Sequence, residues 1–149
     1  TYVYMAGGAF TMFTSPWVGK LADKHGKLKI FTIFMVLNLI PIAIITHLGV
    51  TPVALVLVVT TFFFVTSNGR YVPAAALVTG TAKPENRGSF LSFNSAVQQL
   101  AAGFASLLAG FLIGENELGQ LTNFNYVGYL AIFFSILCIP LAWRIKVVS

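Results

Sequence analysis

Long stretches of the 149-residue chain contain no Asp, Glu, Lys or Arg. These charge-free stretches cover residues 1–19, 30–69, 88–114 and 118–143. A helix needs about 20 apolar residues to cross the hydrocarbon core of a bilayer, so each stretch is long enough to span it. The second stretch has room for two crossings, because HLGVTP at 47–52 supplies the glycine and proline typical of a turn. The pattern predicts five transmembrane helices at about 1–19, 28–47, 53–79, 89–113 and 125–143.

The composition agrees with a lipid environment. Hydrophobic residues make up 57% of the chain and charged residues 9%, whereas soluble domains carry about 25% charged residues. We therefore expect an all-α, polytopic membrane helix bundle over residues 1–149, with the lipid bilayer as its partner. The sequence starts at Thr1 and shows no signal-peptide pattern, so we expect it to begin inside a longer reading frame.

The basic residues segregate to one side of the predicted bundle. Four follow the first helix, three lie toward the end of the third helix or after it, and two follow the fifth. They are Lys20, Lys24, Lys27, Lys29, Arg70, Lys83, Arg87, Arg144 and Lys146. The other side has Glu115 and Glu117 and no basic residue. Because cytoplasmic loops are enriched in Lys and Arg, the basic side is predicted to be cytoplasmic, in an inner (plasma) membrane.

The net charge of +5 does not indicate a nucleic-acid partner. Such binding needs basic residues on one soluble surface with aromatic side chains for stacking, and here the aromatic residues lie inside the predicted spans. The single cysteine, Cys138, lies in the predicted fifth helix. We expect it to be a small core residue, with no disulfide and no cysteine-based metal site.

The connection between the first two predicted helices has the sequence GKLADKHGKLK at 19–29. Gly19 lets two helix ends approach closely, and Gly26 permits a tight reversal. Asp23 can accept hydrogen bonds from a helix N-terminus or pair with a basic residue on a neighbouring helix. On charge alone, the alternative is a solvated anchor loop whose lysines only set the topology.

This sequence resembles the G-x-L-a-D-r-x-G-r-r signature between the second and third helices of major facilitator superfamily transporters, repeated less strictly between the eighth and ninth. The matching positions include Gly19, Asp23, Lys24, Gly26 and Lys27. PENRG is similar to the family's P-e-x-R-G loop, and it supplies Pro84, Glu85, Arg87 and Gly88. The resemblance covers essentially the whole chain. It implies half of a major facilitator fold, in which Asp23 helps to stabilise one of the alternating conformations.

Five helices that begin one helix before the signature correspond to helices two to six or eight to twelve of the family's twelve. The earlier set implies an intramembrane arginine near Thr60 or Thr61 and a Gly-Pro pair in 89–113, and this chain has neither. The segment at 4–23 is similar to the eighth helix of bacterial sugar and drug efflux proteins. The resemblance therefore implies helices eight to twelve, with the remaining N-terminal helices as a partner.

Polar side chains inside the predicted spans are candidates for a site, because hydrocarbon offers them no water. Arg70 lies about 27 Å along the third helix from its outer end. It can snorkel to the headgroups, or it can face a cavity and bind an anionic substrate group or a carboxylate of the other half. The fourth helix carries Asn94, Gln98 and Gln99, which can form interhelical hydrogen bonds or line a substrate cavity.

Two helices carry packing and bending signals. In the first helix a small residue recurs every four positions, at Gly7, Thr11, Ser15 and Gly19. We expect close packing there and a bend at Pro16. In the third helix, Pro73 removes a backbone donor near Arg70 and is expected to loosen the helix.

Three functional classes follow from these features. An intramembrane enzyme is not expected, because the chain lacks H-E-x-x-H, an intramembrane Asp pair and a Ser–His arrangement. The family resemblance implies a secondary active transporter, an antiporter that exports a small organic solute in exchange for protons by alternating access. Because no acid lies in a predicted span, any coupling carboxylate belongs to another part of the protein. A non-transporting scaffold or truncated relic is the alternative, and we expect no cofactor and no metal.

Overall fold

The computed structural model describes residues 2–47, 52–116 and 121–145. Over these residues the chain forms five long α-helices, one 3-10 helix and one two-stranded hairpin. The helices are α1 Tyr2–His25, α2 Lys27–His47, α3 Val53–Gly80, α4 Arg87–Leu112 and α5 Phe124–Trp143, and the 3-10 helix η1 is Pro84–Asn86. Strands β1 (Gly114–Glu115) and β2 (Leu121–Thr122) pair antiparallel between α4 and α5. The all-α bundle predicted from the charge-free stretches is confirmed.

The predicted boundaries hold for four helices and are wrong for the first. Helix α1 continues to His25, so Gly19, Asp23 and Lys24 are helical rather than part of a loop. The charge pattern marks where the apolar span ends, whereas a helix can continue beyond it into a polar layer. The basic side chains in the last turn of α1, Lys24 and His25, also suit the negative end of the helix dipole.

Gly26 alone separates α1 from α2. Its φ of 95° lies in the left-handed region, which glycine adopts without steric cost. The Gly26 amide donates to the Ala22 carbonyl oxygen at 3.0 Å. The predicted tight reversal at Gly26 is therefore confirmed.

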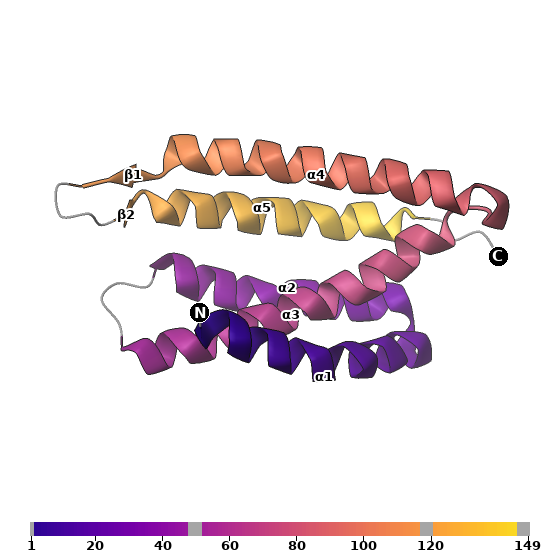
Figure 1. The fold of residues 1–149 in the computed structure, drawn as a ribbon, viewed down its shortest axis with the longest axis horizontal. Helices are drawn as coiled ribbons and strands as arrows, with labels where there is room; N and C mark the ends of the chain where they lie inside the picture. Colours follow the sequence, from indigo (N-terminus) through magenta and orange to yellow (C-terminus); the bar gives the residue numbers. More distant parts are fainter. Residues whose placement is uncertain (1, 48–51, 117–120, 146–149) are drawn as a thin grey trace.

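The five helices run up and down, and each is antiparallel to the next (Figure 1). Helices α1, α2 and α3 pack together, α5 packs against α2, and α4 lies beyond α5 (Figure 1). The α1–α2 connection, the α3–α4 connection and the C-terminal end of α5 lie at one end, which we call the basic end. The basic residues there are Lys20, Lys24, Lys27, Lys29, Lys83, Arg87 and Arg144. Lys146 and Glu117 lie outside the described residues, and Arg70 lies inside α3 rather than at its end.

By length and composition, four helical segments in the described part of the chain could cross a membrane. They are α2, α3, η1 with α4, and α5. Helix α1 is not among them, although it is charge-free up to Gly19. Its glycine, serine and threonine residues make it less apolar than the other helices.

The tightest packing joins α2 to its neighbours. One apolar cluster consists of Phe31 and Met35 of α2, Leu77 of α3 and Ala142 of α5. A second consists of Val18 and Ala22 of α1 with Ile30 of α2. Both clusters lie toward the basic end.

Three glycines within the long helices allow a side chain of a neighbouring helix to approach the backbone closely. Gly7 of α1 meets Phe64 of α3, Gly69 of α3 meets the ring of Phe34 of α2, and Gly128 of α5 meets Thr46 of α2. The packing role predicted for Gly7 is confirmed. The close approach predicted at Gly19 is wrong for the described residues, because no atom lies within 4 Å of the position that its Cβ would take.

Candidate functional site

A buried polar cluster holds α2 against α3. Asn38 is 1% exposed and Thr66 is 2% exposed. The Nδ2 atom of Asn38 donates to Thr66 Oγ1 at 2.7 Å and to Ser67 Oγ at 3.0 Å. Hydrogen bonds of this kind each contribute about 0.6 kcal/mol on average within membranes. The cluster sets the register of the two helices and so positions the next turn of α3.

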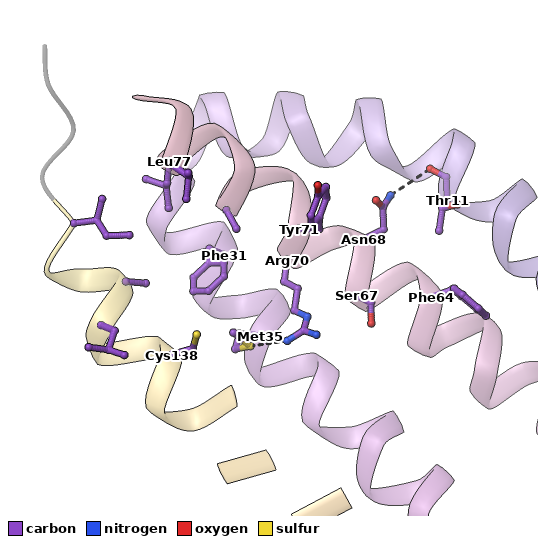
Figure 2. A pocket seen from close by; sticks show the side chains of 15 residues that line it. Thr11, Phe31, Met35, Phe64, Ser67, Asn68, Arg70, Tyr71, Leu77 and Cys138 are labelled. Carbon is purple, nitrogen blue, oxygen red and sulfur yellow. Dashed lines mark hydrogen bonds between the residues drawn. The ribbon is translucent and has the colours of Figure 1, made fainter. Parts of the chain in front are cut away.

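A second polar contact joins α3 to α1. Asn68 Nδ2 donates to Ser15 Oγ and, at 3.5 Å, to the Thr11 carbonyl oxygen (Figure 2). Thr11 and Ser15 belong to the four-residue repeat in α1, so their predicted packing role is confirmed. The sequence reasoning missed Asn38 and Asn68; the available signal was an amide side chain inside a charge-free stretch.

Arg70 lies on α3 shortly after Thr66, Ser67 and Asn68, which form these contacts. Its Nη1 donates to Met35 Sδ of α2 at 3.3 Å, and its guanidinium points into the space between α2, α3 and α5 (Figure 2). Helix α3 continues for about 15 Å beyond Arg70 toward the basic end. Of the two placements expected from the sequence, the structure therefore has the one in which Arg70 faces a cavity.

Two cavities meet at Arg70. The first, which we call the Arg70 pocket, has a volume of about 870 Å³ and is lined by α1, α2, α3 and α5. The second has a volume of about 770 Å³ and is lined by α2, α3, α4 and α5. Both volumes are typical of small-molecule sites. The two cavities share Met35, Arg70 and Cys138.

Cys138 of α5 is exposed and lies near the Arg70 guanidinium in the cavity wall (Figure 2). The expectation of a buried core residue is wrong. Helix α5 is apolar on all sides, so its sequence does not show which of its residues face a neighbouring helix and which face a cavity.

Arg70 has no carboxylate partner among the residues that the structure describes. The acids there are Asp23, Glu85 and Glu115, and all three are exposed residues outside the middle of the bundle. A charged side chain within a membrane span normally pairs with an opposite charge or faces a wet cavity. The structure provides the cavity.

The side-chain amides of α4 lie outside the two cavities that meet at Arg70. Asn94 is half-buried, Gln98 and Gln99 are exposed, and none of the three side chains forms a hydrogen bond over the described ranges. None of them lines the Arg70 pocket or the second cavity. Helix α4 lines the second cavity with Ala101, Phe104, Ala105 and Leu108. Of the four candidate substrate or coupling residues, Arg70 alone lines the Arg70 pocket or the second cavity.

The two motif segments lie at the basic end (Figure 1). Asp23, Gly26 and Lys27 line a third cavity there, of about 640 Å³, together with Leu77 and Trp143. Asp23 is exposed and forms no ion pair or hydrogen bond through its side chain within residues 2–47, 52–116 and 121–145. The second motif begins in η1 and continues into α4. Its residues Pro84, Glu85, Arg87 and Gly88 are exposed.

Two further side-chain contacts join α2 to α5. His47 Nε2 lies 3.1 Å from Tyr129 Oη, and Trp143 Nε1 donates to Thr32 Oγ1 at 3.3 Å. His47 Nδ1 lies 2.9 Å from the Ala43 carbonyl oxygen. If Nδ1 carries the proton, Nε2 accepts a hydrogen bond from Tyr129. His47, the first residue of the predicted HLGVTP turn, ends α2 and contacts α5.

Four helical segments that are long and apolar enough to cross a membrane indicate a multi-pass membrane protein. The family model of the Major Facilitator Superfamily matches residues 1–148, which include α1. The chain therefore belongs to the Major Facilitator Superfamily, and its bundle is part of a major facilitator fold. Members of this family are membrane transporters rather than enzymes. A search of curated proteins and a search of solved structures found no match to the chain.

Proposed function

We propose that residues 1–149 are one partial transporter domain, helices eight to twelve of a secondary active transporter that works by alternating access. The observation that carries this proposal is the placement of both loop motifs at the basic end of an up-and-down bundle (Figure 1). Positions 60 and 61 are threonine rather than arginine, and α4 has no Gly-Pro pair. Both observations support the C-terminal half.

The proposed transporter exports a small organic solute across the inner (plasma) membrane in exchange for protons. The segment at 4–23, which is similar to efflux proteins, supports export. The bias of basic residues supports a cytoplasmic basic end. The described helices carry no acid within their apolar parts, so the proposed coupling carboxylate belongs to the remaining N-terminal helices.

Asp23 and its neighbours are the proposed conformational switch. Gly26 makes the tight reversal between α1 and α2, and Asp23, Gly26 and Lys27 line the third cavity. Asp23 is exposed and has no partner among the described residues, so it is available to a helix of the other half. Its ion pair or hydrogen bond would then form in one conformation and break in the other.

Arg70 is the proposed substrate-binding residue. Arg70→Lys keeps the positive charge but removes the planar, five-donor guanidinium, so we expect transport to fall by about tenfold or more. Arg144→Lys, at the exposed C-terminal end of α5, is the matched control. The measurement is uptake of labelled solutes by inside-out vesicles containing the full-length protein, with and without a pH gradient.

The amount of protein in the membrane is measured for each variant. Normal transport by Arg70→Lys would contradict the role of Arg70. Solute uptake that ignores the pH gradient would contradict proton coupling. No transport of any solute by the unmodified protein would favour the alternative, a non-transporting scaffold or truncated relic.

A further inference from the structure

We propose that the Arg70 pocket binds an amphipathic organic monoanion, with its charged group on the Arg70 guanidinium and its apolar part along the pocket wall. This inference rests on the proposed transport function and names the substrate class of the same site.

The first support is the unfilled hydrogen-bonding capacity of Arg70. A guanidinium has five N–H donors. In the parts of the chain that the structure describes, its one hydrogen bond goes to Met35 Sδ, and a thioether is a weak acceptor. A carboxylate, sulfonate or phosphate monoester would fit the guanidinium with two parallel hydrogen bonds.

A hydroxyl group lies on the same face of α3. Ser67 precedes Arg70 by three residues, so the two side chains are neighbours on the helix surface. Ser67 Oγ accepts a hydrogen bond from Asn38 Nδ2, which leaves its own hydrogen for a ligand. Both side chains extend from α3 toward the same side (Figure 2). The site therefore offers one full positive charge and one neutral donor, which suits a single anionic group.

The rest of the Arg70 pocket is mostly apolar. Phe31, Phe64, Leu77, Leu141 and Ile145 contribute to its wall. Beyond Arg70 and Ser67, a small, strongly hydrated anion would find few polar groups there to replace its water. An anion with an apolar body would instead bury apolar surface along the wall.

Arg70 lies where the two cavities meet. The Arg70 pocket extends to Leu77 and Ile145 near the basic end, and the second cavity extends to Thr46 and Phe124 near the opposite end. An anionic group held by Arg70 could therefore keep its position while the apolar part lies in either cavity. This geometry fits a site that is reached from alternate sides of the membrane.

Cys138 allows the local charge to be measured without transport. It is the single cysteine of this chain, is exposed and lines both cavities. Its thiolate attacks a methanethiosulfonate reagent, forming a mixed disulfide and releasing methanesulfinate. The probes are a sulfonate-bearing reagent and a trimethylammonium-bearing reagent, applied to the full-length protein in vesicles of neutral lipid.

We expect Cys138 to react about tenfold faster with the anionic reagent than with the cationic one, after correction for their rates with a free thiol. Arg70→Gln should bring the ratio of the two rates close to one, and Arg144→Gln should leave the ratio unchanged. The ratio is informative because any effect of Arg70 on the thiol itself acts equally on both reagents. Cys138→Ser identifies labelling at other cysteines of the full-length protein.

Protection of Cys138 then identifies the ligand class. Decanoate should slow labelling at about tenfold lower concentration than decanol or decyltrimethylammonium, and Arg70→Gln should remove this difference. Protection by decanoate in neutral-lipid vesicles supports a free organic anion. Protection by added anionic lipid alone also supports the anion site and identifies a lipid headgroup as its source.

A rate ratio near one in the unmodified protein, unchanged by Arg70→Gln, would overturn the proposal, because a carboxylate elsewhere in the transporter would then neutralise Arg70. Equal protection by decanoate and decanol would also overturn it. Failure of the proposed function has a different signature: a relic shows charge-selective labelling without transport, whereas a transporter of neutral solutes shows transport without selectivity.

Discussion

The α2–α3 pair and α4 are two extremes of packing within one chain. Between α2 and α3, Asn38 and Thr66 are almost completely buried, and Gly69 brings Phe34 against the α3 backbone. Helix α4 has 26 residues, compared with 21 in α2 and 28 in α3, but none of its residues is buried. All three helices are apolar and belong to the same bundle, so apolar composition by itself does not show which helices form the packed core. Helices pack closely where glycine lets a neighbour approach and where polar side chains form hydrogen bonds between helices.

The polar residues of the two regions differ in the same way. The amide nitrogen of Asn38 donates to two hydroxyl groups of α3, whereas the side chains of Gln98 and Gln99 are exposed and have no hydrogen-bond partner among the described residues. Three substitutions can break or sharpen this comparison.

The largest effect is expected at Gly69. In Gly69→Val, the new side chain overlaps the ring of Phe34, so α2 and α3 are forced apart and stability falls by about 3 kcal/mol. The matched control is Gly103→Val in α4, where no atom lies within 4 Å of the new Cβ. The melting temperatures of both variants in detergent provide the measurement. Equal losses would show that the two helices are packed alike.

A smaller loss is expected at Asn38. Asn38→Ala removes the donor to Thr66 and Ser67, and we expect it to lower the free energy of unfolding by about 1 kcal/mol. Asn38 Oδ1 is buried without a partner in the described structure, so Asn38→Leu should cost less than Asn38→Ala. Gln99→Ala on α4 is the control and should change stability by less than about 0.5 kcal/mol. Reversible unfolding in detergent and denaturant measures these differences. A Gln99→Ala loss as large as that of Asn38→Ala would contradict the comparison.

The smallest effect is expected where α5 attaches to the packed helices. Tyr129→Phe removes the hydroxyl that lies 3.1 Å from His47 Nε2, at an exposed position. A solvent-exposed hydrogen bond contributes little, so we expect a loss of about 0.5 kcal/mol. The same unfolding measurement applies, with Tyr126→Phe as control, because no hydrogen bond of the Tyr126 hydroxyl is present in the described structure. A loss above about 2 kcal/mol would mean that this contact, rather than the apolar cluster at the basic end, holds α5 in place.

Particular residues show how far sequence reasoning reached. The four later helices begin and end close to the predicted positions, because glycine, proline and charged residues interrupt the apolar stretches there. Gly26 makes the tight reversal that its residue type suggests. The end of α1 was missed, because charges mark the edge of a membrane span and do not by themselves end a helix. Gly19 and Cys138 were misjudged, since both judgments depended on which helix lies opposite.

Only part of the candidate site could be predicted from the sequence. Arg70 stands out as a charge in an apolar helix, but its two possible directions could not be distinguished without the neighbouring helices. Ser67 and Met35 lie beside it in space, although Met35 lies on another helix, 35 residues away along the chain.

The sequence by itself determined that this chain is a bundle of long apolar helices with its basic residues at one end, because the hydrocarbon core excludes charge and admits helices of a minimum length. Only the tertiary structure decided which faces of those helices meet, that Arg70 points into a cavity and that no residue of α4 is buried. In a bilayer both the lipid-facing and the packed sides of a helix are apolar, so the order of residues carries little information about which side is which.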